Sequence, residues 1–183
     1  MKGPRTLRRT QFGNPILREV ARRLSSAEIK SDKIQTLITN MCHTLAHKKY
    51  GVGLAAPQVG QGVALSVVGI KPTPTRPQNP TIDMVIINPE VVKTYGNTEP
   101  MWEACVSFGD THNFPYALVP RHTKIRLRWC DEHARQHEQD FDGFLAHVLQ
   151  HETDHLNGIL FVDRVVDTKS YVTAAEYKKR YLR

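Results

Sequence analysis

The chain has 183 residues, of which 40% are hydrophobic and 23% are charged, a composition typical of one globular domain with a core of its own. It has no run of the ~18 apolar residues that a membrane span requires, and its basic start lacks the apolar stretch of a secretory signal. The formal net charge of +7 indicates an anionic partner such as RNA, although a merely basic surface gives the same charge and no nucleic-acid-binding motif is present.

The cysteines indicate a reducing compartment. Cys42, Cys105 and Cys130 form an odd and sparse set that does not suit a disulfide framework. We therefore expect a cytoplasmic protein; a short Arg-rich organellar presequence would have room only before about Phe12. A lone cysteine is usually a small buried hydrophobe, which is our expectation for Cys42 and Cys130.

The first half of the chain predicts one helix and one strand. Apolar residues recur at three- and four-residue steps over residues 26–48, with Ser25 or Ser26 as the helix start. A glycine-punctuated loop follows at 51–62, and the apolar run at 63–70 predicts a buried strand.

The second half predicts further strands before a late helix. Four prolines make residues 71–81 an exposed loop, and residues 84–92 and 123–131 have strand patterns. Helical spacing returns at 142–157, and the basic tail at 174–183 is also expected to be helical. This order indicates an α+β fold rather than regular βαβ alternation.

The late helix contains a metal-binding pattern. His151, Glu152 and His155 form the His-Glu-x-x-His signature of zinc proteases. Residues four apart share one helix face, so both imidazoles can reach one ion, and Glu152 lies close enough to act on a bound water. A solvated helix face with two ordinary histidines would show the same five residues.

The third ligand decides the kind of enzyme. The metzincin pattern requires a histidine at position 161, which is Phe161 here. A thermolysin-like enzyme would use a glutamate roughly twenty residues downstream, for which Glu176 is the candidate, but Glu176 lies in the charged tail, where a solvated charge is the simpler interpretation. Neither protease pattern is well supported, and a cysteine thiolate is the other candidate.

Three segments taken together resemble the peptide deformylase family. The motifs of that family are Gly-x-Gly-x-Ala-Ala-x-Gln, Glu-Gly-Cys-x-Ser and Gln-His-Glu-x-Asp-His. Residues 51–58 and 150–155 match the first and third completely, and residues 103–107 match the second except for Ala104 in place of glycine. The order and spacing of the motifs agree as well.

The resemblance runs from about residue 12 to residue 165, because "FGNPILR" and "INPEVV" also match. It implies a single catalytic domain over residues 1–183, with this core and a basic tail at 166–183. It also implies mostly antiparallel β-sheets packed around a central helix that carries the His-Glu-x-x-His motif.

The resemblance implies a hydrolase that removes the N-formyl group from the initiator methionine of nascent chains and releases formate. The implied metal ligands are Cys105, His151 and His155. Glu152 would take a proton from water in the open fourth position and return it to the leaving amine. The Gln58 side chain and the backbone N–H of Val106 would stabilise the oxyanion. One Fe²⁺ per chain is implied, although Zn²⁺, Ni²⁺ or Co²⁺ also suits two histidines and a cysteine.

The same resemblance implies the substrate-binding residues. They are Val52, Gly53, Ala104, His147 and Val148. Gly51 and Gly53 let backbone approach a peptide closely, whereas Ala104 adds a Cβ beside the metal ligand, which bears on substrate fit. His147 is too far along the helix from His155 to share an ion. We expect it to be partly solvated at the pocket edge without a chemical role; the alternative is a polar, titratable pocket wall.

Neighbouring residues have expected supporting roles. Asp154 is expected to stabilise the helix or the ligands rather than bind the ion. Glu103 and Arg121 would either brace the cysteine loop or form a surface ion pair of little consequence. Residues 108–121 are expected to be a loop beside the cleft.

Two other functions stay open. One is a His-Glu-x-x-His metalloprotease that cleaves internal peptide bonds. The other is a catalytically weak member retained as a ribosome-associated protein, for which Ala104 is the only support. The implied partners are N-formylmethionyl nascent peptides in a bacterial cytoplasm and the ribosome, through the basic tail, with no membrane and no direct DNA binding.

Overall fold

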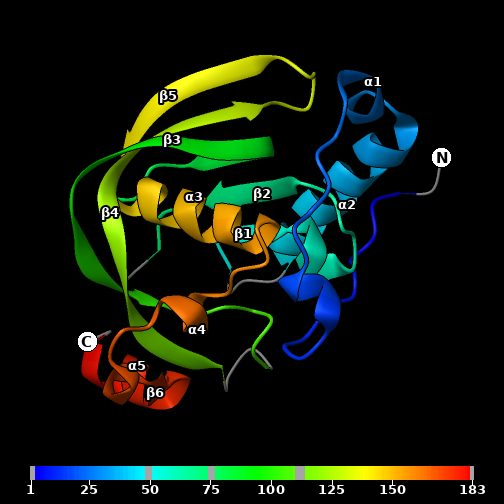
Figure 1. Ribbon diagram of the computed structural model, residues 1–183. Helices are drawn as coiled ribbons and strands as arrows, with labels where there is room; N and C mark the ends of the chain where they lie inside the picture. Colours follow the sequence, from blue (N-terminus) through cyan, green and yellow to red (C-terminus); the bar gives the residue numbers. More distant parts are fainter. Residues whose placement is uncertain (1–2, 48–50, 74–76, 110–113, 182–183) are drawn as a thin grey trace.

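A curved antiparallel sheet wraps around one helix, α3 (Gly143–Leu156), in the computed structural model (Figure 1). The structure describes residues 3–47, 51–73, 77–109 and 114–181. Figure 1 shows α1 and α2 on one side of α3, and α4 and α5 near the chain's C-terminal end on another. The predicted single domain of mixed helix and antiparallel sheet, an α+β class, is confirmed.

Five strands pair in sequence order, each antiparallel to the next. They are β1 (Gly53–Ala55), β2 (Leu65–Ile70), β3 (Ile82–Glu103), β4 (Pro115–Cys130) and β5 (Gln136–Asp142). A short β6 (Val172–Thr173) pairs with the start of β4. Strands were therefore predicted where β2, β3 and β4 lie, but β3 and β4 are much longer than expected and β5 was not predicted.

Irregular pairing bends the long β3–β4 hairpin. Register shifts interrupt the pairing at three places between Ile87 and Thr98. At the first, Asn88 has a φ of 52°, and its side-chain amide binds both the N–H and the C=O of Leu24, at 2.8 and 2.7 Å. Bulges increase twist and bend the strand that carries them, so the hairpin curves around α3 and brings its far end to that helix (Figure 1).

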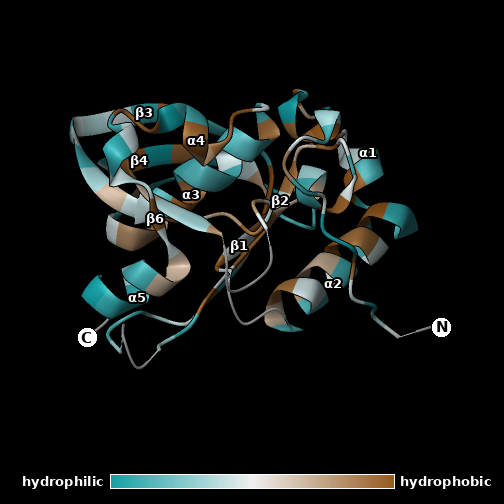
Figure 2. Cartoon of the chain, turned by 90° about the horizontal axis from the view of Figure 1, so that it is seen from below, coloured by the Kyte–Doolittle hydropathy of each residue, from teal (hydrophilic) through white to brown (hydrophobic). Residues whose placement is uncertain are grey.

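The helix predicted at residues 26–48 is two helices, α1 (Ser26–Ile29) and α2 (Asp32–His47). Ser25 caps α1 in a capping box with Glu28, as expected from the sequence. Figure 2 shows hydrophobic and hydrophilic residues alternating along α2, as a helix with one buried face requires.

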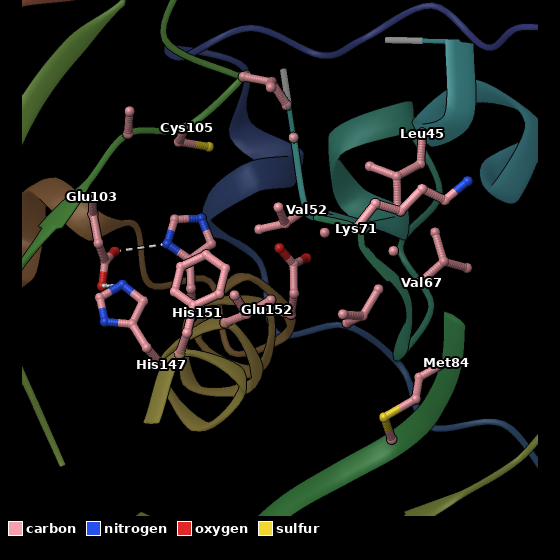
Figure 3. A pocket seen from close by; sticks show the side chains of 18 of the residues that line it. Leu45, Val52, Val67, Lys71, Met84, Glu103, Cys105, His147, His151 and Glu152 are labelled. Carbon is pink, nitrogen blue, oxygen red and sulfur yellow. Dashed lines mark hydrogen bonds and ion pairs between the residues drawn. The ribbon is translucent and has the colours of Figure 1, made fainter. Parts of the chain in front are cut away.

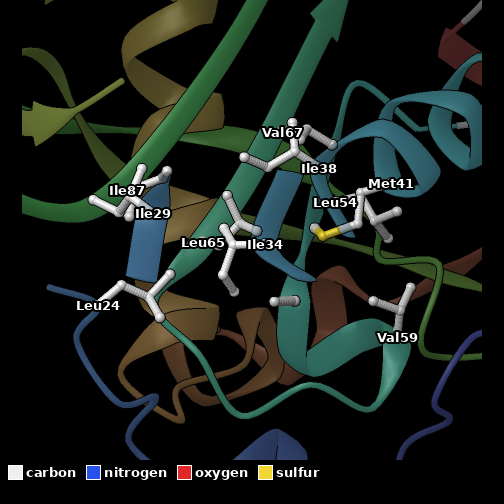
Figure 4. Close-up of a cluster of buried hydrophobic side chains, with 11 residues drawn as sticks. Leu24, Ile29, Ile34, Ile38, Met41, Leu54, Val59, Leu65, Val67 and Ile87 are labelled. Carbon is white, nitrogen blue, oxygen red and sulfur yellow. The ribbon is translucent and has the colours of Figure 1, made fainter. Parts of the chain in front are cut away.

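That face packs against β1 and β2 in a hydrophobic cluster (Figure 4). The cluster comprises Leu24, Ile29, Ile34, Ile38, Met41, Leu54, Ala56, Val59, Leu65, Val67 and Ile87. Burial of each Leu or Ile side chain stabilises the fold by about 1.5–3 kcal/mol. The cluster therefore fixes α2 beside β1, the strand that lies within the first glycine motif.

A second cluster fixes α3 against the inner face of the sheet. It comprises Val68, Ile70, Ile86, Ile125, Leu127, Trp129, Phe141, Ala146, Val148 and Leu149. The polar residues of α3 from Gln150 to His155 are also buried or nearly so. Burial of a polar group costs free energy unless the group has a hydrogen-bond or ion-pair partner. These buried polar residues therefore indicate a candidate functional site.

The C-terminal region crosses the end of the sheet. After α4 (Phe161–Arg164) and the 3-10 turn Thr168–Ser170, β6 leads into α5 (Ala174–Tyr181), which confirms the predicted helix in the tail. Ala174 and Tyr177 are buried, so one face of α5 packs against the rest of the protein. None of the described helices combines the length and apolarity that a membrane crossing needs.

Candidate metal and catalytic centre

The three implied ligands lie together although they come from two distant segments. Cys105 follows β3, and His151 and His155 lie one turn apart on α3. Their ligand atoms all lie within 4.8 Å of one another, and Cys105 Sγ is 3.3 Å from His155 Nε2. Atoms that bind an ion at ~2.0–2.3 Å lie within roughly twice that distance of each other. The group therefore fits a single ion.

Glu103 orients His151. Its Oε2 lies 2.7 Å from His151 Nδ1, which leaves the other ring nitrogen for Cys105 and an ion (Figure 3). Burial alone would lower the pKa of His151, but the Glu103 carboxylate raises it well above its ordinary value. Burial and the His151 charge instead keep the pKa of His155 well below its ordinary value. A carboxylate behind a ligating histidine fixes its orientation and increases its basicity.

A buried ion network supports Glu103. Arg121 Nε donates to Glu103 Oε1 at 2.7 Å, and Arg121 Nη1 donates to Asp154, which also accepts from Arg164 at 2.7 Å. Glu103 is 3% exposed and Arg121 is 4% exposed. Burial would raise the pKa of Glu103, but the neighbouring histidines and Arg121 hold it well below its ordinary value. The alternative of a surface ion pair is therefore wrong, and Asp154 faces the two arginines.

Glu152 is buried, which favours its protonated form. It is 3% exposed, and its Oε2 has no hydrogen-bond partner among the described residues. Burial raises the pKa of Glu152 to about 7, with the Glu103 charge adding to the shift and the His151 charge opposing it. A carboxyl group with a pKa near the working pH is suited to both accept and return a proton.

Gly53 makes room for Glu152. A Cβ on Gly53 would lie 2.2 Å from Glu152 Oε1 and 2.5 Å from its Cδ. Any side chain at this position would displace the carboxylate. The first motif thus needs glycine for close approach, and the side chain that approaches is Glu152.

Gln58 is held with its amide donor toward the site. It lies in a 3-10 turn, Ala56–Val59, directly after β1. Its Oε1 accepts from the Ala55 N–H at 2.8 Å, and its Nε2 donates to Cys105 Sγ at 3.2 Å and Ser107 Oγ at 3.3 Å. The first bond sets which end of the amide faces Cys105.

The N-terminal segment supports both halves of this site from behind. The Thr10 N–H donates to the Gln58 carbonyl and the Phe12 N–H donates to the Ser107 carbonyl, both at 2.7 Å. The Arg9 guanidinium donates to the Val106 carbonyl at 3.0 Å. The N-terminal segment therefore links the segment that contains Gln58 to the segment that contains Val106 through hydrogen bonds.

A cavity of about 690 Å³ opens over these groups (Figure 3). Val52, Gly53, Ala104, His147 and Val148, all expected to bind substrate, line it together with Gln58, Cys105, Val106, His151 and Glu152. In the described ranges the non-glycine residues with positive φ are Asn88 and Ala134. Ala104 thus has a backbone conformation open to alanine, and its departure from the motif introduces no backbone strain.

His147 differs from expectation. It is 5% exposed, and its Nε2 lies 3.0 Å from Glu103 Oε1, while its Nδ1 lies 3.0 Å from Met101 Sδ. Burial lowers the pKa of His147 in spite of the nearby carboxylate. The expectation that His147 is partly solvated was wrong, because Glu103 turns toward α3 and accepts from His147 and His151 (Figure 3).

Three smaller expectations need correction. Cys42 is exposed and lines the cavity, and Cys130 is only half-buried, so neither is a buried hydrophobe. The expected loop at 108–121 becomes strand from Pro115 onward, because this segment pairs with β3; residues 110–113 lie outside the described part of the chain.

The sequence analysis did not predict several other residues that line the cavity. Leu45, Lys71 and Met84 lie on one side, and Trp102, Tyr116 and Tyr177 line another part of the same cavity. Tyr177 and Tyr181 are four residues apart, which indicates a shared helix face, but nothing in the local sequence shows where that face packs.

Comparisons with known proteins identify the family of the chain. Residues 7–171 match the family model for polypeptide deformylase. The chain is 39% identical over 163 residues to a peptide deformylase of Leptospira biflexa, covering 88% of each protein, and 36% identical over 177 residues to peptide deformylase 2 of a Nostoc species, covering 96% of this chain and 95% of the relative.

Solved structures give the same result. A class I type b peptide deformylase from Acinetobacter baumannii bound to Met-Ala-Ser has a TM-score of 0.80 at 32% identity, covering 87% of this chain and 98% of that one. A peptide deformylase from Synechococcus elongatus in complex with actinonin has a TM-score of 0.76 at 34% identity, covering 95% and 85%. The chain therefore belongs to the peptide deformylase family, hydrolases that remove the formyl group from an N-terminal methionine.

Proposed function

We propose that this chain carries out deformylation with one divalent ion held by Cys105, His151 and His155, and with Glu152 as the general base. The observation that supports this most strongly is the convergence of three ligand atoms within 4.8 Å beside a buried carboxyl group whose pKa is raised to about 7. A bound ion would supply Lewis acidity and lower the pKa of a water molecule.

Glu152 moves the proton in this proposal. It accepts a proton from the attacking water and later delivers it to the amine nitrogen of the departing methionine, so one group serves both steps. The Glu152 side chain lies against Gly53. Its Oε2 has no hydrogen-bond partner in the described structure, so that oxygen is available for the proton transfer.

Gln58 and Val106 would stabilise the oxyanion that develops on the formyl oxygen. The Gln58 amide is fixed beside Cys105 by its bond to Ala55, and Val106 directly follows Cys105. Donors that are already oriented cost no reorganisation during the reaction. Val52, Gly53, Ala104, His147 and Val148 would contact the formylmethionyl peptide from the cavity wall.

The native ion in this proposal is Fe²⁺. The set of one thiolate and two imidazoles suits iron, zinc, cobalt and nickel alike, so the ion is tested by anaerobic purification and metal analysis. Parent protein should contain close to one iron per chain. Zinc with full activity in anaerobic preparations would contradict the assignment.

The ribosome is the proposed partner of α5, in the cytoplasm where formylated chains emerge. Lys178, Lys179 and Arg180 lie at the end of this helix, whereas Tyr177 on the same helix is buried. Truncation of the helix would also remove the buried Tyr177. The double substitution Lys178→Glu with Lys179→Glu changes only basic residues and is therefore the better test. It should weaken salt-sensitive ribosome binding; unchanged affinity in 50 and 200 mM salt would contradict the role of α5.

Substrate choice tests the function itself. Formyl-Met-Ala-Ser should release formate, whereas acetyl-Met-Ala-Ser and casein should remain intact. Intact casein would exclude endoprotease activity. Cys105→Ala should lose both bound metal and turnover, with Cys130→Ala as the matched control that keeps both. Stoichiometric metal in Cys105→Ala would contradict the three-ligand site, and casein cleavage by the parent would favour the protease alternative.

A further inference from the structure

Glu103 is held by donors on both of its carboxylate oxygens. On one side, the Arg121 guanidinium donates through Nε to Oε1 at 2.7 Å and through Nη2 to Oε2 at 3.2 Å. On the other side, His147 Nε2 lies 3.0 Å from Oε1 and His151 Nδ1 lies 2.7 Å from Oε2. An ionised carboxylate has about four acceptor positions, so these contacts occupy all of them.

The two histidines approach Glu103 from successive turns of α3. His147 is four residues before His151, so both rings lie on one face of the helix and the carboxylate lies between them (Figure 3). His151 belongs to the group of three candidate ligands, whereas His147 lies too far along the helix from His155 to share their ion. His147 is therefore connected to the candidate ligands through Glu103.

The contacts of the His147 ring indicate which nitrogen carries its proton. A carboxylate oxygen only accepts, so Nε2 donates to Glu103. Burial lowers the pKa of His147, so the ring is neutral at pH 7 and Nδ1 carries no proton. Nδ1 faces Met101 Sδ at 3.0 Å, and a thioether has no proton to donate. Of these two contacts, the one with Glu103 is the hydrogen bond.

We propose that His147 is a positioning residue for the metal centre: its Nε2–H fixes the Glu103 carboxylate so that Oε2 stays on His151. Without this donor, Oε1 keeps its bond from Arg121, but the carboxylate is freer to turn about its Cγ–Cδ bond and to weaken the contact with His151. Partners behind a ligating histidine orient its ring and strengthen metal binding. The inference rests on the ligand set of the proposed function and adds a residue that does not bind the ion itself.

Competition between Co²⁺-loaded protein and EDTA tests this role, because Co²⁺ suits two histidines and a cysteine. His147→Leu removes the donor and fills a similar space, and it should bind Co²⁺ about tenfold more weakly than the parent, the lower end of the range for such outer partners. His147→Gln is the rescue variant, because its amide N–H can replace Nε2–H, and its affinity should stay close to that of the parent. Met101→Leu changes the contact at the other ring nitrogen and should also match the parent.

If His147→Leu does not fold, His147→Met takes its place with the same expectation, because Met is also apolar and adapts to irregular space. Parent-like affinity in the apolar variant would overturn the role, and so would equal weakening in His147→Gln and Met101→Leu, which would show an effect of packing alone. A change confined to KM for formyl-Met peptides would assign His147 to the cavity wall and would also overturn it. A parent that binds no Co²⁺ would instead refute the ligand set of the proposed function.

Discussion

Two sides of the cavity begin at consecutive residues of β3 and are built on different principles. Glu103 turns toward α3 and joins a network of buried charged groups, whereas Trp102 packs among rings from β4 and α5. The charged side depends on directional bonds with a partner for each group, and it tolerates little change. The aromatic side depends on ring packing, which adjusts more easily to substitution and to different substrates.

The charged side should be the more fragile. Arg121→Met leaves Glu103 and Asp154 buried without their shared partner, and we expect a loss of about 3–5 kcal/mol in the free energy of unfolding, measured by urea denaturation. Arg126→Met is the matched control on the same strand, because Arg126 pairs with Asp140 but is 43% exposed; its loss should stay below about 1 kcal/mol. Similar losses in both variants would remove the contrast between buried and exposed pairs.

Gly53→Ala separates the fit of Glu152 from the fit of the substrate. The added Cβ would overlap the Glu152 carboxylate, so kcat should fall by about 10²–10⁴ while metal content stays near that of the parent. Gly51→Ala is the control, since its Cβ would meet no atom closer than 3.4 Å, and kcat should fall far less. Equal kcat in the two variants would show that the close approach of Gly53 and Glu152 has no catalytic importance.

The buried carboxyl group should also make stability depend on pH in an unusual direction. Because the pKa of Glu152 is raised to about 7 in the folded state, the unfolded chain loses this proton first as pH rises, and the metal-free protein becomes less stable between about pH 4.5 and 7. Glu152→Gln removes the titration. In chelator-treated protein its melting temperature should equal that of the parent at pH 5 and exceed it at pH 8; the same difference at both values would contradict the shift.

The motif residues could be predicted because their chemistry is local in sequence. The spacing of His151 and His155 follows from the helix repeat, and three matching segments together indicated Cys105, which helix spacing alone does not. The residues that complete the site could not be predicted in the same way. The contact of His147 with Glu103 and the packing of Tyr177 on Tyr116 join distant segments, and no local pattern encodes either contact.

The limits of the strands were missed for related reasons. β5, with the sequence QHEQDFD, is almost entirely polar, so it shows no alternation of polar and apolar residues and forms only by pairing with β4. β3 contains Pro89 and three register shifts, and these interrupt the periodicity on which a strand prediction depends. The positions of β2, β3 and β4 were thus predictable although the lengths of β3 and β4 were not, and β5 was missed altogether.

The bonds from the N-terminal segment have a consequence for how the enzyme matures. Arg9 and Val106 are 97 residues apart in sequence, and both Gln58 and Ser107 are held by residues made near the start of the chain. Contacts of such long sequence separation form late, because the intervening chain must first be ordered. A partly folded chain would therefore hold these segments apart, and activity during refolding would appear together with the complete tertiary structure rather than with its first helices.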